Sequence, residues 1–234
     1  MAQNREPLDF EKLNQQIPPA DEKAGAAALA RWNSIAKPVG SLGLLEDAVV
    51  RLARSQGQAW PTIDRRGVVV MAGDNGVLAQ GVAQTPAAIT AVMAAHIAAG
   101  SSAVGLMAKT ARAEMFVADL GMLTHPAVPA LRDHRIAPGT ADMTQGPAMS
   151  RSQAERGIAI GIELVREAAA QGYQILATGE MGIGNTTTSS AVAAVLLHQE
   201  PASMVGRGAG LSDAGLLAKR RAVEQAVRIN QPDA

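Results

Sequence analysis

A glutamate lies among three glycines in the segment 177–188, Ala-Thr-Gly-Glu-Met-Gly-Ile-Gly-Asn-Thr-Thr-Thr. Residues 173–177 before it have the composition of a strand. Residues 186–198 after it read as a helix rich in Ala, Val and Leu, with Asn185 as the expected N-cap. Glycines at such a junction let the backbone approach a ligand, and a helix N-terminus offers unpaired N–H groups to an anion. The pattern predicts a phosphate site in which Glu180 faces a sugar hydroxyl or a nitrogen heterocycle of the same ligand. The alternative is a glycine-rich turn with one solvated glutamate.

The composition narrows the class of ligand and partner. The 234 residues include no cysteine, which excludes disulfides, thiolate metal ligands and a cysteine nucleophile. Aromatic residues are only 2% of the chain, so a heterocycle must lie between aliphatic, methionine and backbone surfaces. Because 21 basic residues balance 21 acidic ones, no net charge attracts nucleic acid. We therefore expect small-molecule substrates and no nucleic-acid partner.

The distribution of apolar residues bears on fold and location. A hydrophobic content of 47% in a chain of this length is enough to bury a substantial core. The start of the chain lacks the apolar core of a signal peptide, and no uninterrupted apolar run is long enough to span a bilayer. These features predict a cytoplasmic protein with no membrane partner.

The elements that must position the glutamate alternate between strands and helices. The run 67–72, Gly-Val-Val-Val-Met-Ala, is typical of a buried parallel strand. Residues 121–148 carry four prolines and predict a functional loop rather than regular structure. The other expected strands are 113–120, 173–178 and, as a short strand or a glycine loop, 204–210. The expected helices are 21–36, 44–55, 86–99, 102–110, 149–171, 186–198 and 212–229.

This alternation predicts an α/β fold with a parallel sheet flanked by helices in residues 61–234, preceded by a helical arm in residues 1–60. Ligands of such sheets bind beyond the carboxyl ends of the strands. The loops expected at that edge are 73–76, 119–121, 179–184 and 206–210. Asp74 and Asp119 end strands there, where a carboxylate either binds a ribose or caps a helix.

Other chemistries find less support in the sequence. The glycines of 206–210 suggest a dinucleotide fingerprint, but the segment lacks the strand–helix position and the acidic partner that a dinucleotide-binding oxidoreductase needs. No glycine loop is followed by Gly-Lys-Ser/Thr, so nucleotide hydrolysis on a P-loop is not indicated. The histidines have no metal-ligand spacing, and we expect none of them to bind a metal: His96, His125, His134 and His198.

Four segments carry a resemblance to a known family. They are Lys-Pro-Val-Gly-Ser-Leu-Gly-Leu-Leu-Glu (37–46), Ala-Gly-Asp-Asn-Gly-Val (72–77), Gly-Pro-Ala-Met-Ser (146–150) and Gly-Glu-Met-Gly-Ile-Gly-Asn-Thr-Thr (179–187). In this order they resemble the nicotinate-nucleotide–dimethylbenzimidazole phosphoribosyltransferases of cobalamin assembly. The resemblance implies transfer of phosphoribose from nicotinate mononucleotide to 5,6-dimethylbenzimidazole. It also implies a Rossmann-like sheet, a small second domain that includes the helical arm, a homodimer, and neither a metal nor a redox cofactor.

The resemblance also implies roles for single residues. Glu180 falls where the family places a carboxylate close to base and ribose, as an orienting group or a substitute base. Gly182 and Lys219 match phosphate-binding positions, while Thr85 and Met181 match residues of the base pocket. Met93 departs from the glutamine that faces the base in a relative, which bears on the base preferred. Asn75 replaces the histidine common in the first loop of the family. The expected substrate-binding residues are Asp74, Thr85, Met93, Met181, Gly182, Asn185, Thr186, Gly206, Gly208 and Lys219.

The family's main general base is a glutamate in a Gly-Glu-Gly motif. The resemblance places that motif after residues 229–232, in further strands and helices, so the expectation is a chain without the family's C-terminal third. Residues 1–234 contain no Gly-Glu-Gly. The alternative reading is therefore a protein that binds a nucleotide or a corrinoid precursor without efficient transfer.

Overall fold

The computed structural model describes residues 8–233, in two compact units that we call the helical unit (Met1–Asp64) and the sheet unit (Arg65–Ala234). The helical unit contains α1 (Phe10–Gln15), α2 (Glu22–Ser34) and α3 (Leu44–Gln56). Asp21 caps α2 because its side chain accepts a hydrogen bond from the Ala24 N–H at 2.9 Å. The sequence did not predict α1, since its six residues are too few for a periodic pattern to show.

One glutamate side chain bonds to two residues of the segment between α2 and α3. The buried Glu46 carboxylate pairs with Lys37 at 2.8 Å and accepts from the Leu42 N–H at 3.0 Å. The hydrogen bond from Lys37, followed by that from Leu42, lowers the pKa of Glu46 below its ordinary value. This contribution to stability is complete above the unfolded-state pKa of the glutamate and is lost as the pH falls through the lowered folded-state pKa.

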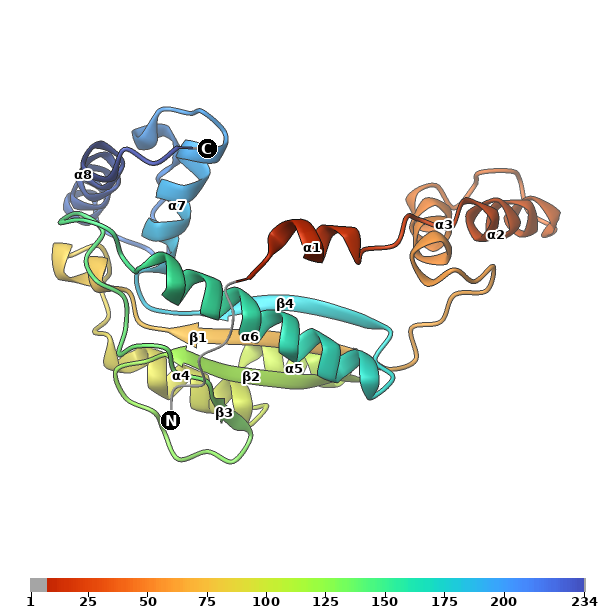
Figure 1. Ribbon diagram of the computed structural model, residues 1–234, viewed down its shortest axis with the longest axis horizontal. Helices are drawn as coiled ribbons and strands as arrows, with labels where there is room; N and C mark the ends of the chain where they lie inside the picture. The colour runs from red at the N-terminus through yellow and green to blue at the C-terminus, as the bar shows by residue number, and fades with distance from the viewer. Residues whose placement is uncertain (1–7, 234) are drawn as a thin grey trace. The chain divides into compact units, whose positions relative to one another are not determined.

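The sheet unit is built on four parallel strands in the order β3-β2-β1-β4 (Figure 1). They are β1 (Arg66–Gly73), β2 (Ala113–Gly121), β3 (Leu131–Asp133) and β4 (Ile175–Met181). The parallel α/β fold expected from the alternation is confirmed. The three residues of β3 lie in the proline-rich segment that was expected to be a loop. The expected end of β4 at residue 178 was wrong, because pairing with β1 continues to Met181.

Helices cover both faces of the sheet (Figure 1). On one face α4 (Ala88–Ala98) and α5 (Ala103–Thr110) pack against Val70 and Val117 of the strands. On the other face α6 (Arg151–Ala170) places Ile160, Leu164 and Ala168 against Val69 and Phe116. Val69 and Val70 therefore point to opposite faces, as the alternation of a strand requires. An all-apolar strand such as β1 is stable here because both of its faces are buried.

The stretch from Ala88 to Thr110 is long and apolar enough to cross a membrane by length and composition alone. In the structure it folds as two helices, α4 and α5, separated at Gly100, whose φ of 71° is in the left-handed region. Ala94 and Ile97 of α4 are buried in the core beneath the sheet. Packing on the sheet thus accounts for part of the apolar character of the stretch, while Leu106 and Met107 of α5 are exposed.

Two further helices lie beyond the carboxyl ends of the strands (Figure 1). They are α7 (Asn185–Leu196) and α8 (Asp213–Asn230), which pack on each other. A 3₁₀ turn at Pro201–Met204 follows α7, and no strand forms over 204–210, so this segment takes the glycine-loop form. A second 3₁₀ turn at Gly76–Gln80 follows β1. These elements enclose the carboxyl edge of the sheet on one side.

Candidate active site at the carboxyl edge of the sheet

The junction between β4 and α7 differs from the expected one by one residue. Glu180 and Met181 are the last residues of β4, and Gly184, with φ of 92°, is the N-cap of α7. Asn185, expected to be that cap, is instead the first helical residue. Its backbone N–H donates to the Gly182 carbonyl at 3.0 Å, and its Nδ2 donates to Oε1 of Glu180. The left-handed turn thus brings the amide of Asn185 against the carboxylate of Glu180.

The register of the sheet fixes the side on which Glu180 lies. Glu180 is paired with Met71, and Met181 with Ala72. Neighbours in register point to the same face of a sheet, so Glu180 lies on the α6 face with Met71 and Met181 on the α4 face with Ala72. Glu180 is exposed, and its carboxylate is available to a ligand from the α6 side.

The close packing of two loops requires a glycine at position 182. A β-carbon at this position would lie 2.3 Å from the carbonyl oxygen of Gly73 and 2.8 Å from Nδ2 of Asn75. The same Nδ2 donates to the Ile183 carbonyl at 3.2 Å. The loop after β4 is therefore pressed against the loop after β1, and only glycine fits between them.

The substitution Gly182→Ala should lower the free energy of unfolding by about 1–3 kcal/mol, the usual cost of overpacking, because a backbone carbonyl cannot move aside as a side chain can. Urea unfolding measures the change. Gly179→Ala is the matched control in the same segment, since its β-carbon would meet Cγ2 of Val70 at an ordinary 3.5 Å. Equal stability of the two variants would show that the close approach at Gly182 is not a constraint.

A cavity of about 230 Å³, here called the small cavity, lies between the β4–α7 loop and the start of α8. Gly182, Gly184 and Thr186 line it from one side, and Gly208 and Lys219 from the other. Gly208 has φ of 55°, and a β-carbon there would lie 3.0 Å from Oγ1 of Thr186 and 3.4 Å from Nζ of Lys219. The glycine keeps this side of the cavity open.

Lys219 is the principal charge of the small cavity. Its side chain is 1% exposed, and Nζ donates to Oγ1 of Thr186 at 2.6 Å and to the Gly206 carbonyl at 3.1 Å. Within residues 8–233, no carboxylate pairs with this ammonium group. Burial lowers the pKa of Lys219, since the charged form loses its hydration. A buried cation with two neutral acceptors and no counterion is suited to bind an anion.

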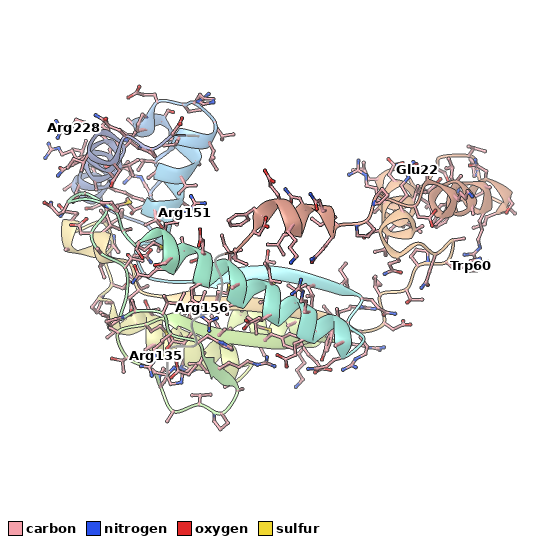
Figure 2. The ribbon with its side chains drawn as sticks, viewed as in Figure 1. Glu22, Trp60, Arg135, Arg151, Arg156 and Arg228 are labelled. Carbon is pink, nitrogen blue, oxygen red and sulfur yellow. The ribbon has the colours of Figure 1, made fainter. Side chains whose placement is uncertain are left out.

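A second cavity of about 820 Å³, here called the large cavity, lies on the α6 face of the carboxyl edge. Glu180 and Asp74 line it, together with Ser150 and Gln153. The last two belong to the start of α6, the helix on which Figure 2 labels Arg151. Ser150 and Gln153 form a capping box, in which the side chain of each accepts from the backbone N–H of the other. Met181 and Asn185 line both cavities, so the two spaces meet at the β4–α7 junction.

Asp74 directly follows β1 and is buried, at 6% exposure. Its Oδ2 accepts from the Leu123 N–H at 2.8 Å, and its backbone carbonyl accepts from the Thr140 N–H at 3.0 Å. Its Oδ1 is buried and has no partner among the protein atoms described. Asp74 therefore ties together three loops of the large cavity and keeps one acceptor unused.

The structure brings most of the expected site residues together. Those in the small cavity are Thr85, Met181, Gly182, Asn185, Thr186, Gly208 and Lys219; those in the large one are Asp74, Glu180, Met181 and Asn185. Gly206 contributes its carbonyl to Lys219. Met93, expected to contact the base, is on α4 and lines neither cavity. Arg207 lines the small cavity and was not singled out, although it lies within the glycine segment 206–210 that was.

Asp119 and His125 form a cluster that sequence spacing did not predict. Asp119 is fully buried; its Oδ1 accepts from the N–H groups of Gly121 and Met122, and its Oδ2 lies 2.7 Å from Nδ1 of His125. Ligand atoms of Asp119, His125 and Asp133 lie within 4.8 Å of one another, the arrangement of a possible metal site. However, Arg135 holds both oxygens of Asp133, at 2.9 and 2.6 Å. Arg135 therefore already pairs with Asp133, and Asp119 caps a turn and lines neither cavity.

Comparison with known proteins places this geometry in context. A family model described as a phosphoribosyltransferase matches residues 17–234. The nicotinate-nucleotide–dimethylbenzimidazole phosphoribosyltransferase of Clostridium tetani is 39% identical over 224 residues, 96% of this chain and 62% of that protein. Its counterpart in Chloroflexus aurantiacus is 41% identical over 219 residues, 93% of this chain and 62% of that protein. The crystal structure of CobT from Thermus thermophilus superposes with a TM-score of 0.84 at 40% identity, over 89% of this chain and 63% of that one. The chain therefore spans somewhat less than two thirds of the length of these relatives.

Proposed function

This chain belongs to the phosphoribosyltransferase family whose model spans its residues 17–234, and we propose that it transfers phosphoribose from nicotinate mononucleotide to 5,6-dimethylbenzimidazole or a related base. The products are α-ribazole phosphate and nicotinate, for use in assembling the lower ligand of cobalamin. The names of the relatives supply the reaction. The observation in this chain that carries the proposal is the buried Lys219, without a carboxylate partner in the described residues, beside the glycine turn at the start of α7.

The small cavity is proposed to receive the phosphate. Gly184 caps α7 without a side chain, and the positive end of the helix dipole favours an anion there. The N–H groups of Asn185 and Thr187 donate to the carbonyls of Gly182 and Gly184, which leaves the Thr186 N–H as the first-turn donor without a partner among residues 8–233. Lys219 adds a charge-assisted hydrogen bond from the opposite wall, with Thr186 and Gly208 beside it. Arg207 also lines this cavity, but its guanidinium pairs with Asp213 at 2.5 Å and donates to the Leu211 carbonyl at 2.8 Å, so Lys219 is the cation proposed to meet the phosphate.

The sugar and base are proposed to lie where the two cavities meet, next to Met181 and Glu180. The reaction is a displacement at the anomeric carbon: the bond to the pyridinium nitrogen of nicotinate breaks, and a benzimidazole nitrogen forms the new bond. The benzimidazole also loses its N–H proton, which a base must accept. Glu180 is exposed to the large cavity and hydrogen-bonded by Asn185, an arrangement that suits a carboxylate orienting the ribose or the base.

A binding function without efficient transfer is the second candidate. The observation that favours it is the lack of a Gly-Glu-Gly motif in residues 1–234, the motif that holds the general base in the resemblance described above. Under this alternative the small cavity still binds the phosphate of a nucleotide. The two candidate functions differ in whether the bound nucleotide is converted to α-ribazole phosphate.

The test is to incubate the chain at high concentration with nicotinate mononucleotide and 5,6-dimethylbenzimidazole and to detect α-ribazole phosphate by chromatography. We expect product only when both substrates are present, in an amount that rises with protein concentration. Mononucleotide binding without any product would support the binding function. Absence of both binding and product would contradict the proposed function.

The family resemblance also supports a homodimer that acts in the cytoplasm. Sedimentation velocity of the chain tests the first of these proposals. A single species at the mass of one chain, across the concentration range of the activity assay, would contradict it.

A further inference from the structure

We propose that Asn185 is a positioning residue: its side-chain amide holds the Glu180 carboxylate where the two cavities meet and leaves Oε2 as the oxygen that accepts from the substrate. This inference deepens the proposed function and rests on it. It assigns to Asn185 a role through Glu180, in place of the direct substrate contact expected from the sequence.

The contact itself is specific in direction. An ionised carboxylate only accepts hydrogen bonds, so the atom of Asn185 that meets Oε1 of Glu180 must be the amide nitrogen. Within the part of the chain that the structure describes, no hydrogen bond reaches the second oxygen of Glu180. One oxygen is thus fixed by the protein and the other faces the large cavity, whose wall Glu180 forms.

The position of Asn185 supports a role other than helix capping. Asparagine stabilises a helix chiefly as the N-cap, where its side chain accepts from the backbone of the first turn. Here Gly184 takes the N-cap place and Asn185 follows it as the first helical residue. The chain therefore places an asparagine one residue beyond the position that would stabilise the helix, and its amide reaches back across the turn to β4.

The surrounding charges explain why the hydrogen bond from Asn185 to Glu180 matters. Lys219 and Arg207 line the small cavity, and Asp74 lines the large one. A free glutamate at the junction is attracted toward the ammonium group of Lys219, where it would compete with the phosphate. A neutral donor on the helix holds the carboxylate on the α6 side and leaves the small cavity to the anion.

The substitution Asn185→Asp tests the proposal. It replaces the donor by a second carboxylate of the same shape, and two carboxylates in contact repel each other unless they share a proton. The affinity of each protein for nicotinate mononucleotide is measured by calorimetry at two pH values. At each pH the affinity of the variant is divided by that of wild type, because this ratio cancels the effect of the ligand's own titration. We expect a loss of about tenfold or more at pH 7.5, the equivalent of about one pKa unit, and recovery to near the wild-type affinity at pH 5.

Three controls keep the interpretation clear. An aspartate in the first turn favours the helix and offsets part of the repulsion from Glu180, so Asn185→Asp should still be fully folded at both pH values before urea is added, as the urea unfolding curve shows. Asn185→Ala, which lacks the donor but adds no charge, should bind more weakly at both pH values. Gln199→Glu adds one negative charge beyond the other end of α7, outside both cavities, and should bind like wild type.

A ratio that is the same at pH 7.5 and pH 5 would overturn the positioning role while leaving the proposed function intact. Wild-type affinity in Asn185→Ala would overturn it as well. If wild type itself failed to bind nicotinate mononucleotide at either pH, the proposed function would fall and this inference with it.

Discussion

The 234-residue chain is expected to form α-ribazole phosphate at least about 100-fold more slowly than the same chain extended by the segment that carries the Gly-Glu-Gly motif. General base catalysis typically contributes about 10²–10⁴-fold, and the base that the resemblance implies is not among residues 1–234. The exposed Glu180 is the nearest substitute, and the large cavity beside it is open enough to admit water, which weakens charge stabilisation in the transition state.

The measurement compares single-turnover rates of the chain with those of a fusion carrying the corresponding segment of the Thermus thermophilus relative, of which this chain covers 63%. Glu180→Gln in both proteins shows which of them relies on Glu180 for the proton. Equal rates for the chain and the fusion would mean that Glu180 or solvent suffices as the base, and would refute the dependence on the additional segment.

The second large effect is expected at Lys219. Replacing it by alanine should weaken binding of nicotinate mononucleotide by about 1.5–3 kcal/mol, the range for a hydrogen bond to a charged group, or about 10- to 150-fold. The side chain is buried and its ammonium group has only the neutral acceptors Thr186 and Gly206, so a bound phosphate would be its sole anionic partner within the described residues.

Loss of binding at this position must be separated from loss of fold. Lys219→Met keeps most of the side-chain volume, and replacing an uncompensated buried charge by an apolar group is often neutral or stabilising. We therefore expect Lys219→Met to unfold at or above the wild-type temperature while binding as weakly as the alanine variant. Calorimetry that finds wild-type affinity in either variant would exclude Lys219 from the phosphate site.

Periodic features of the fold could be predicted from the sequence. The apolar runs of β1 and β2 and the Ala-rich helices α4 and α6 are long enough to show their period, and their alternation implies a parallel sheet. The position of the glycine loops at the carboxyl edge follows from that topology. The existence of a site near Glu180 could therefore be inferred before its geometry was known.

Details that depend on three-dimensional contact could not be predicted. The N-cap at Gly184 follows from a left-handed φ that a glycine permits but does not signal, so the more usual cap Asn185 was preferred. The pairing of Asp119 with His125 depends on a turn stabilised by the same aspartate. The lack of a carboxylate beside Lys219 among residues 8–233 is likewise a property of packing, although it is the strongest single indication of an anion site.

The central claim is that the small cavity around Lys219 receives the phosphate of the nucleotide. It is tested most directly by titrating wild type and Lys219→Met with nicotinate mononucleotide and with nicotinate riboside, which lacks only the phosphate. We predict that wild type prefers the mononucleotide by about tenfold or more and that the variant loses this preference, with riboside affinity unchanged. A wild type that binds both ligands equally, or a variant that keeps the full preference, would contradict the claim.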